Sequence, residues 1–318
     1  MINRVILLFF IACVSTSLLS FINKTEPAPK AQIKTLVIDP GHGGIDPGAR
    51  GSFSTEAEVS LAVSLKLGKA LQEEFPDLKI IYTRTTDVMA GNKRTKDEGL
   101  RYRANLANES GGDLFIAIHC NSAPDIPHKQ LTGYRTMATY VGRGKKRRKV
   151  NKKVPQYRHW STPNPAHGTE TYIWAVNKNE AKVSAMNKIA AGEEYGEMDS
   201  TLTIELPDPS DPAEKARMLI YAQNYFKKSL TLADLVEKEF IASGRFSRGV
   251  KQRNHAGIWV LQATGMPSIL VEIGFMSDDE DEKYINSESG QQEIVEDIVN
   301  AFRTYKQRVE SRSITTSP

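Results

Sequence analysis

The stretch Leu36–Gly51 reads LVIDPGHGGIDPGARG. It begins as a continuous apolar run, which is typical of a strand buried on both faces of a parallel sheet. The run then enters a loop of glycines, prolines and aspartates that carries one histidine, His42. Such a loop suggests either a phosphate site or a metal site, and the two alternatives require different partners elsewhere in the chain.

The phosphate alternative does not fit the residues that follow. A dinucleotide site needs the pattern GxGxxG opening directly into a helix. Here Gly41-His42-Gly43 is followed by Gly-Ile-Asp, and helical periodicity begins only near Glu56. The loop also lacks the Lys-Ser/Thr pair of a P-loop, and Asp46 would repel phosphate. The sequence therefore favours a metal site.

The rest of the chain alternates between strand and helix patterns. We expect further strands at LKIIYTR (78–84), Asp113–Asn121, Gly168–Trp174 and Pro267–Ser277. We expect helices at Glu56–Phe75, Leu100–Glu109, Ala216–Ile241 and about Gln291–Val309. This alternation predicts an α/β fold, a single domain with a mostly parallel twisted sheet flanked by helices on both faces.

Three of the expected strands lead into side chains that bind metals or protons. The first leads into His42, the third reaches His119, the last contains Glu272, and Glu56 opens the first helix. Ligands gather at the carboxyl ends of parallel strands, so these residues would converge. Catalytic zinc takes three protein ligands and leaves one position for water, and a nearby carboxylate can act as acid and base.

Each of these residues also has a simpler interpretation. A lone histidine in a loop is usually a surface residue, and an acid in the first turn of a helix is stabilised by the helix dipole. Glu58 is an alternative to Glu56 as a ligand. Glu272 lies in the apolar run SILVEIGF, where a charge is costly without a partner, so it is either catalytic or part of a structural ion pair. Cys120 is expected to belong to the core.

Composition and the first residues bear on where the protein acts. The chain has 318 residues, 40% of them hydrophobic and 25% charged, and its net charge of +4 is too small to indicate nucleic acid as a partner. Arg4 followed by the apolar Val5–Val14 predicts an export signal at residues 1–22, with an uncleaved anchor or lipidation of Cys13 as alternatives. Cys13 and Cys120 are the only cysteines, which excludes a disulfide framework in the mature chain.

Several motifs together resemble one family. They include IDPGHGGIDPGARG, TRTTD, LRYRANLANESGGDLFIAIHCNSA, GTETYIW and SRGVKQRNHAGIWVLQATGMPSILVEIGFMSD. They resemble the zinc-dependent N-acetylmuramoyl-L-alanine amidases of the type-3 class, which trim bacterial cell wall during division. The likeness extends from Lys34 to about Phe302, apart from two insertions.

The resemblance implies an activity and a role for each site residue. The residues matching His42, Glu56 and His119 would bind one Zn²⁺ per chain, and Glu272 would be the catalytic acid/base. The substrate would be peptidoglycan, cleaved at the amide between N-acetylmuramic acid and L-alanine. A zinc carboxypeptidase or endopeptidase acting on stem peptides, and an inactive wall-binding homologue, remain as alternatives.

The expected organisation is a signal at 1–22, a linker at 23–33, a catalytic domain at 34–310 and a polar tail at 311–318, in a protein exported to the periplasm or cell envelope. Insertions are expected at 124–166 and 177–214. The first carries RGKKRRKVNKK and is expected to be a solvated loop, with attraction to anionic wall or lipid headgroups as the alternative. Asn121 and Arg248 flank the expected site as candidates for substrate binding.

The second insertion is acidic. In some amidases of the family an inserted segment covers the zinc until an activator protein removes it. The resemblance therefore implies an autoinhibitory role for Glu193, Glu194 and Glu197, and an activator as a partner. The alternative is an acidic surface loop without a regulatory role.

Overall fold

The protein is represented by a computed structural model that describes residues 32–174, 212–253 and 258–312. One compact unit, Ile33–Tyr305, contains the sheet and the helices packed on it up to Tyr305. A second unit combines Met1–Gln32 with Lys306–Pro318. The expected export signal and Cys13 lie outside the described residues. Across the described ranges, no helix combines the length and apolar character needed to cross a membrane.

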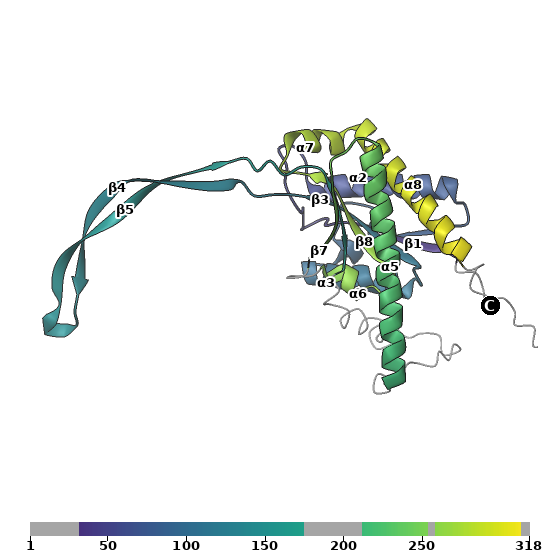
Figure 1. The fold of residues 1–318 in the computed structure, drawn as a ribbon, viewed down its shortest axis with the longest axis horizontal. Helices are drawn as coiled ribbons and strands as arrows, with labels where there is room; N and C mark the ends of the chain where they lie inside the picture. The colour runs from purple at the N-terminus through teal and green to yellow at the C-terminus, as the bar shows by residue number, and fades with distance from the viewer. Residues whose placement is uncertain (1–31, 175–211, 254–257, 313–318) are drawn as a thin grey trace, which may run out of the picture. The chain divides into compact units, whose positions relative to one another are not determined.

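The central sheet has six strands in the order β2-β1-β3-β8-β6-β7. Parallel pairing joins β2 to β1, β1 to β3, β3 to β8 and β6 to β7, whereas β6 runs antiparallel to β8. The prediction of a mostly parallel sheet is therefore confirmed (Figure 1). The strands are β1 (Thr35–Pro40), β2 (Lys79–Tyr82), β3 (Leu114–Asn121), β6 (Thr169–Ile173), β7 (Ser247–Gln252) and β8 (Ser268–Phe275).

Helices cover both faces of this sheet, as expected. On one face, α3 and α6 contribute Ala107, Val260 and Leu261 to a core cluster with Phe115 of β3 and Leu270 of β8. Figure 1 shows α2 and α8 on the other side of the sheet from α3 and α6. The helices are α2 (Glu56–Glu74), α3 (Lys96–Glu109), α5 (Pro212–Ala242), α6 (Trp259–Ala263), α7 (Asp279–Asn286) and α8 (Glu288–Arg312), with 3₁₀ turns η1 (Ala90–Asn92) and η2 (Gly144–Lys146).

Capping boxes fix where α2 and α3 begin. Thr55 accepts a hydrogen bond from the backbone N–H of Glu58, and the Glu58 carboxylate accepts one from the backbone N–H of Thr55. Thr95 and Glu98 form the same reciprocal pair at α3. Each box satisfies backbone donors that the first turn of a helix leaves free. Helix α3 therefore starts at Lys96, four residues before the start expected from the apolar periodicity alone.

The basic run 145–149 is exposed, as expected of a solvated segment, but the insertion at 124–166 that carries it is not a loop. This segment forms an antiparallel hairpin of β4 (Ile126–Val141) and β5 (Arg148–Thr162), joined through η2. Its Thr, Val, Tyr and Trp residues favour extended structure, and the glycines of Gly142-Arg143-Gly144 adopt positive φ at the turn. The many lysines and arginines in this segment make the residue pattern of the strands hard to recognise in the sequence.

The second insertion is only partly described. Residues 175–211 lie outside the described residues, and they include Glu193, Glu194 and Glu197. Helix α5 begins at Pro212, so the last three residues of the expected insertion, 212–214, are helical.

Candidate functional site

Glycines allow the loop after β1 to pack against the ligand side chains. A Cβ atom on Gly41 would lie 2.5 Å from Cε1 of His119, and one on Gly48 would lie 2.5 Å from Oε2 of Glu56. His42 itself has φ 60°, a left-handed conformation that residues other than glycine rarely adopt. The glycine-rich composition of this loop therefore serves close approach to histidine and carboxylate side chains.

Two buried arginines hold the backbone of the same loop. Arg84 donates from Nη2 to the carbonyl oxygens of Gly41 and Ala57, both at 2.7 Å. Arg103 donates to the carbonyl oxygens of Pro40 and His42 and forms a buried ion pair with Asp39. Charged donors that satisfy buried carbonyl oxygens make this backbone rigid. The unusual conformation of His42 is thereby fixed by the surrounding structure.

The far side of the loop is held by α7. The carboxylate of Glu282 accepts hydrogen bonds from the backbone N–H groups of Ser52, Phe53 and Ser54, at 2.7, 3.0 and 3.0 Å. It also accepts one from the Ser54 hydroxyl at 2.9 Å. We call this contact the Glu282 clasp. It joins a helix near the end of the chain to the segment between His42 and Glu56.

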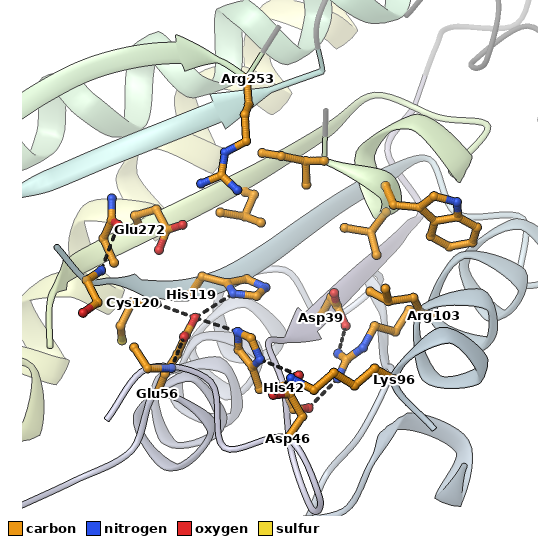
Figure 2. Close-up of a pocket in the computed structure, with 18 of the residues that line it drawn as sticks. Asp39, His42, Asp46, Glu56, Lys96, Arg103, His119, Cys120, Arg253 and Glu272 are labelled. Carbon is orange, nitrogen blue, oxygen red and sulfur yellow. Dashed lines mark hydrogen bonds and ion pairs between the residues drawn. The ribbon is translucent and has the colours of Figure 1, made fainter. Parts of the chain in front are cut away.

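The site centres on His42, Glu56 and His119. Oε1 of Glu56 lies 3.0 Å from Nε2 of His42 and 2.7 Å from Nδ1 of His119 (Figure 2). One potential ligand atom from each residue lies within 4.8 Å of the others. Two imidazole nitrogens and a carboxylate oxygen converging on one point are the ligand set of a divalent transition metal. The three residues thus form a candidate metal site.

Glu58 is not part of this cluster. Its carboxylate belongs to the capping box with Thr55, whereas Glu56 points toward the histidines. Between the two glutamates, only Glu56 can contribute an oxygen to the candidate metal site.

Electrostatic coupling within the cluster favours the charged forms. Burial alone would raise the pKa of Glu56, but hydrogen bonds from His119 and His42 outweigh it and lower that pKa. Burial likewise opposes charge on His42, and the carboxylates of Glu56 and Asp46 nevertheless raise its pKa. The charged forms of His42 and Glu56 therefore stabilise each other. A bound cation would supply that positive charge instead.

Asp46 orients His42 from behind. Its Oδ2 lies 2.8 Å from Nδ1 of His42, and its Oδ1 lies 2.6 Å from Nζ of Lys96. A carboxylate on one imidazole nitrogen fixes the ring and the tautomer, so that the other nitrogen is available as a ligand. Here the other nitrogen is Nε2, the atom beside Glu56.

Glu272 stands beside the cluster on the neighbouring strand. It pairs with His119 in the register of β3 and β8, and only 8% of its surface is exposed. Its Oε2 is buried and forms no hydrogen bond within the described part of the chain. Burial, followed by the charges of Glu56 and Glu170, raises the pKa of Glu272 well above its usual range. A buried, unpartnered carboxyl next to a metal-type cluster is poised to exchange a proton.

Glu170 is the cross-strand neighbour of Glu272 on the other side. It lies on β6 and accepts hydrogen bonds from Tyr172 at 2.6 Å, from Lys251 at 2.9 Å and from Arg248. Burial would raise the pKa of Glu170, but these three donors lower it. Arg248, a candidate for substrate binding, is therefore engaged with a buried carboxylate and does not line the cleft. Asn121, the other candidate, does line it.

A cleft of about 480 Å³ opens over these groups. Figure 2 shows the Arg253 side chain extending toward the cavity on the side of Glu272, with Lys96 and Asp46 near His42. Trp259 and Ile258 form an apolar part of the wall. The cleft therefore joins a candidate metal site, a protonatable carboxyl, two cationic side chains and an aromatic surface.

Comparison with known proteins shows which family the chain belongs to. A family model described as N-acetylmuramoyl-L-alanine amidase matches residues 36–304, which is most of the chain and includes every residue of the cluster. The chain belongs to this amidase family. The family resemblance expected from the sequence motifs is confirmed.

Individual relatives agree with this membership. The chain is 24% identical over 275 residues to the amidase AmiC of Escherichia coli, covering 85% of this chain and 52% of the relative. It is 35% identical over 127 residues to a germination-specific N-acetylmuramoyl-L-alanine amidase of Bacillus subtilis, covering 38% of this chain and 51% of the relative. The chain thus spans about half the length of these curated amidases.

Solved structures share the fold. An N-acetylmuramoyl-L-alanine amidase from Clostridium difficile has a TM-score of 0.51 at 22% identity, with 86% of this chain and 97% of that chain covered. The amidase Ami1 of Mycobacterium smegmatis also has a TM-score of 0.51, at 15% identity, with 87% and 100% covered. The α/β architecture is therefore that of known amidase structures.

The structure adds three residues to the candidate site that the sequence analysis does not assign to it. Asp46 was considered only as a group that repels phosphate, although its spacing of four residues from His42 within a tight loop is a signal for a second carboxylate behind the ring. Arg253 and Trp259 line the cleft from a segment without strong periodicity. The prediction that Cys120 belongs to the core is confirmed, because its thiol is buried and burial raises its pKa.

Proposed function

We propose that the protein hydrolyses the amide bond between N-acetylmuramic acid and L-alanine in peptidoglycan. The observation that carries the proposal is the convergence of His42, Glu56 and His119 next to the buried carboxyl of Glu272. Membership of the amidase family supports the choice of bond. The set is intact, which argues against an inactive wall-binding homologue.

The residues fit a single Zn²⁺ ion. His42, Glu56 and His119 would hold it, since their ligand atoms already converge and nitrogen with carboxylate oxygen suits zinc. Bound zinc would act as a Lewis acid toward the scissile carbonyl and lower the pKa of a water molecule to about 7. Asp46 would support the site by keeping Nδ1 of His42 protonated.

Glu272 is the proton carrier in this proposal. Its carboxylate accepts the proton of the attacking water and then donates that proton to the departing nitrogen of L-alanine. The positive charge of bound zinc would oppose the raised pKa of Glu272, so that its carboxylate form is available to accept the first proton. Glu170 keeps its own charge because Arg248, Lys251 and Tyr172 stabilise it, so it is not an alternative proton carrier.

The cleft walls suit a peptide joined to a sugar. Arg253 would attract a carboxylate of a stem peptide, and Asn121 would hydrogen-bond the peptide backbone. The indole of Trp259 is 44% exposed and offers a flat apolar surface to a sugar ring. These contacts would place the amide bond between Glu272 and the three zinc ligands.

Organisation and location form part of the proposal. The catalytic domain would span residues 34–310, preceded by an export signal, and the enzyme would act in the cell envelope. Family membership supports a site of action at the cell wall. A regulatory role for 177–214, with Glu193, Glu194 and Glu197 and a protein activator, stays a prediction. Deleting 190–211 should raise basal activity, and unchanged activity would exclude autoinhibition.

Product analysis tests the activity. The purified, zinc-loaded protein is incubated with peptidoglycan sacculi, and the soluble fragments are identified by mass spectrometry. We expect free stem peptides that begin at L-alanine, together with glycan strands that lack peptide. Fragments cut within the stem peptide would identify a zinc carboxypeptidase or endopeptidase instead. No release from either the full chain or the 190–211 deletion would reject hydrolysis.

A further inference from the structure

The charged residues of the β4–β5 hairpin are all basic. Residues 126–162 contain eleven lysines and arginines and no aspartate or glutamate. Six of the seven residues at the tip, Arg143–Lys149, are basic. Within the described residues, no lysine or arginine of the hairpin forms an ion pair.

Register divides the outer half of the hairpin into two faces. Side chains alternate between faces along a strand, and paired residues share a face. The cross-strand pairs Thr139–Val150, Val141–Arg148 and Met137–Lys152 all lie on one face. The apolar side chains of this face are Met137, Val141 and Val150. Its basic side chains are Arg135, Arg148 and Lys152. We call this the aliphatic face. Met137, Val141 and Val150 are all exposed.

The hairpin lacks a layer that would cover this face. Almost every residue of β4 and β5 is exposed, and the two strands form a sheet of their own. An isolated two-stranded hairpin is at best marginally stable in water, because it buries little apolar surface. Exposed aliphatic side chains among unpaired positive charges therefore point to a partner that supplies both apolar contact and negative charge.

We propose that the hairpin docks on the surface of an anionic lipid bilayer. The basic tip and the basic side chains of the aliphatic face would contact lipid phosphates, and Met137, Val141 and Val150 would enter the boundary between headgroups and acyl chains. The hairpin would thus hold the catalytic unit at a membrane.

A lipid surface explains more of the hairpin than a soluble anionic polymer does. A polymer of phosphates would neutralise the lysines and arginines but would leave the aliphatic face in water. A bilayer satisfies both, since basic residues near an anionic surface each gain about 1 kcal/mol and apolar side chains gain from burial. The proposal does not depend on the amidase activity.

The test uses the full chain with one fluorescent label at a chosen face. In a Cys13→Ser background, where Cys120 is buried, Thr139→Cys carries nitrobenzoxadiazole on the aliphatic face. Ala138→Cys, its matched control, carries the label on the opposite face. With vesicles of equimolar phosphatidylglycerol and phosphatidylcholine, the label at 139 should shift to the blue and gain intensity, and the label at 138 should change less. Vesicles of phosphatidylcholine alone should produce neither change.

Two sets of substitutions separate charge from apolar contact. Changing the five basic residues 145–149 to glutamine should lower the apparent partition coefficient reported at 139 by about 100-fold or more. Changing Met137, Val141 and Val150 to serine should abolish the blue shift. The charge-matched control replaces exposed basic residues elsewhere with glutamine, at Lys69, Lys79, Lys227, Lys238 and Lys283.

Three outcomes would overturn the proposal. Equal responses at 138 and 139 would exclude a preferred face. Binding unaffected by the glutamine substitutions at 145–149 would exclude a role for the basic tip. A response to soluble polyphosphate as large as the response to vesicles, and insensitive to the serine substitutions, would identify a soluble anionic polymer as the partner.

Discussion

His119 and Glu272 are direct register partners across the parallel strands β3 and β8. His119 faces Glu56, and the buried carboxyl of Glu272 has no hydrogen bond at Oε2 within the described residues. A single pair of adjacent strands therefore places a candidate metal ligand and a candidate proton carrier side by side. Neither residue relies on a flexible loop for its position, which suits a reaction that requires fixed distances.

Replacing Glu272 should separate zinc binding from turnover. In Glu272→Gln the side chain keeps its shape but loses the proton it carries, so kcat should fall by about 10²–10⁴-fold while the zinc content stays at one per chain. Zinc is measured by mass spectrometry and turnover by release of stem peptides. Glu58→Gln is the matched control, because glutamine also completes a capping box at that position. Normal turnover in Glu272→Gln would remove Glu272 from the mechanism.

Removing the charge behind His42 should weaken zinc binding without unfolding the protein. Asp46→Asn loses the carboxylate that orients the ring, so zinc affinity should fall by about 10- to 100-fold in a competition titration with a chelator. Asp87→Asn is the control, since Asp87 holds the same loop through the backbone N–H of Gly44 without touching the ring. Equal losses in both variants would mean that Asp46 only supports the loop.

Two glycines with the same backbone conformation should respond differently to alanine. Gly48 has φ +66° and Gly111 has φ +63°, so each substitution should cost about 1 kcal/mol of backbone energy. A Cβ at 48 would also lie 2.5 Å from Oε2 of Glu56, whereas one at 111 meets nothing within 4 Å. Gly48→Ala should therefore lose zinc on dialysis and Gly111→Ala should retain it. Identical zinc retention would contradict the packing of this loop against the ligands.

The indole in the cleft should contribute to substrate binding more than to chemistry. Trp259→Ala should raise KM about fivefold with little change in kcat, since stacking on a sugar ring acts equally in the ground state and the transition state. Trp160→Ala on the hairpin removes an equally exposed indole, 43% against 44%, and should leave KM for soluble fragments unchanged. A fall in kcat alone for Trp259→Ala would contradict a binding role.

Stability should depend on pH through Asp297. Burial, together with Glu293 and Glu239, raises the pKa of Asp297 to about 6, against about 3.9 in an unfolded chain. Between these values the folded protein binds more protons than the unfolded chain, so wild-type stability falls as pH rises from about 4 to about 6. Asp297→Asn keeps an acceptor for the Ser243 hydroxyl and avoids this loss. Its Tm advantage should grow over that interval and then stay constant, and an advantage independent of pH would contradict the shift.

The strongly apolar parts of the fold were predictable, and the polar parts were not. Strands β1, β3 and β8 are buried along their whole length or nearly so, which makes their hydrophobic runs unmistakable. Strand β7, SRGVKQ, lies at the edge of the sheet and is half-buried, so its composition does not distinguish it from a loop. In the hairpin, charge concealed a strand pattern that only its cross-strand pairing makes clear.

The candidate site was also predictable only in part. The ends of parallel strands must meet at one edge, so the sequence was sufficient to bring His42, His119 and Glu272 together. Choosing Glu56 over Glu58 from the residues alone required the T-x-x-E capping box, which assigns Glu58 to the start of α2. For Asp46 the only signal is its spacing of four residues from His42, and the position of Arg253 depends on the curvature of the cleft, which local sequence does not encode.

The Glu282 clasp also sets an order in which the enzyme becomes complete during synthesis. The three residues proposed to bind zinc all precede β4, whereas Glu272 and Glu282 emerge from the ribosome near the end of the chain. A nascent or truncated polypeptide that stops before β8 has all three of these residues, but it has no proton carrier and lacks the contact that holds the backbone of Ser52–Ser54. Incomplete copies of this chain therefore lack the group proposed to deliver the proton.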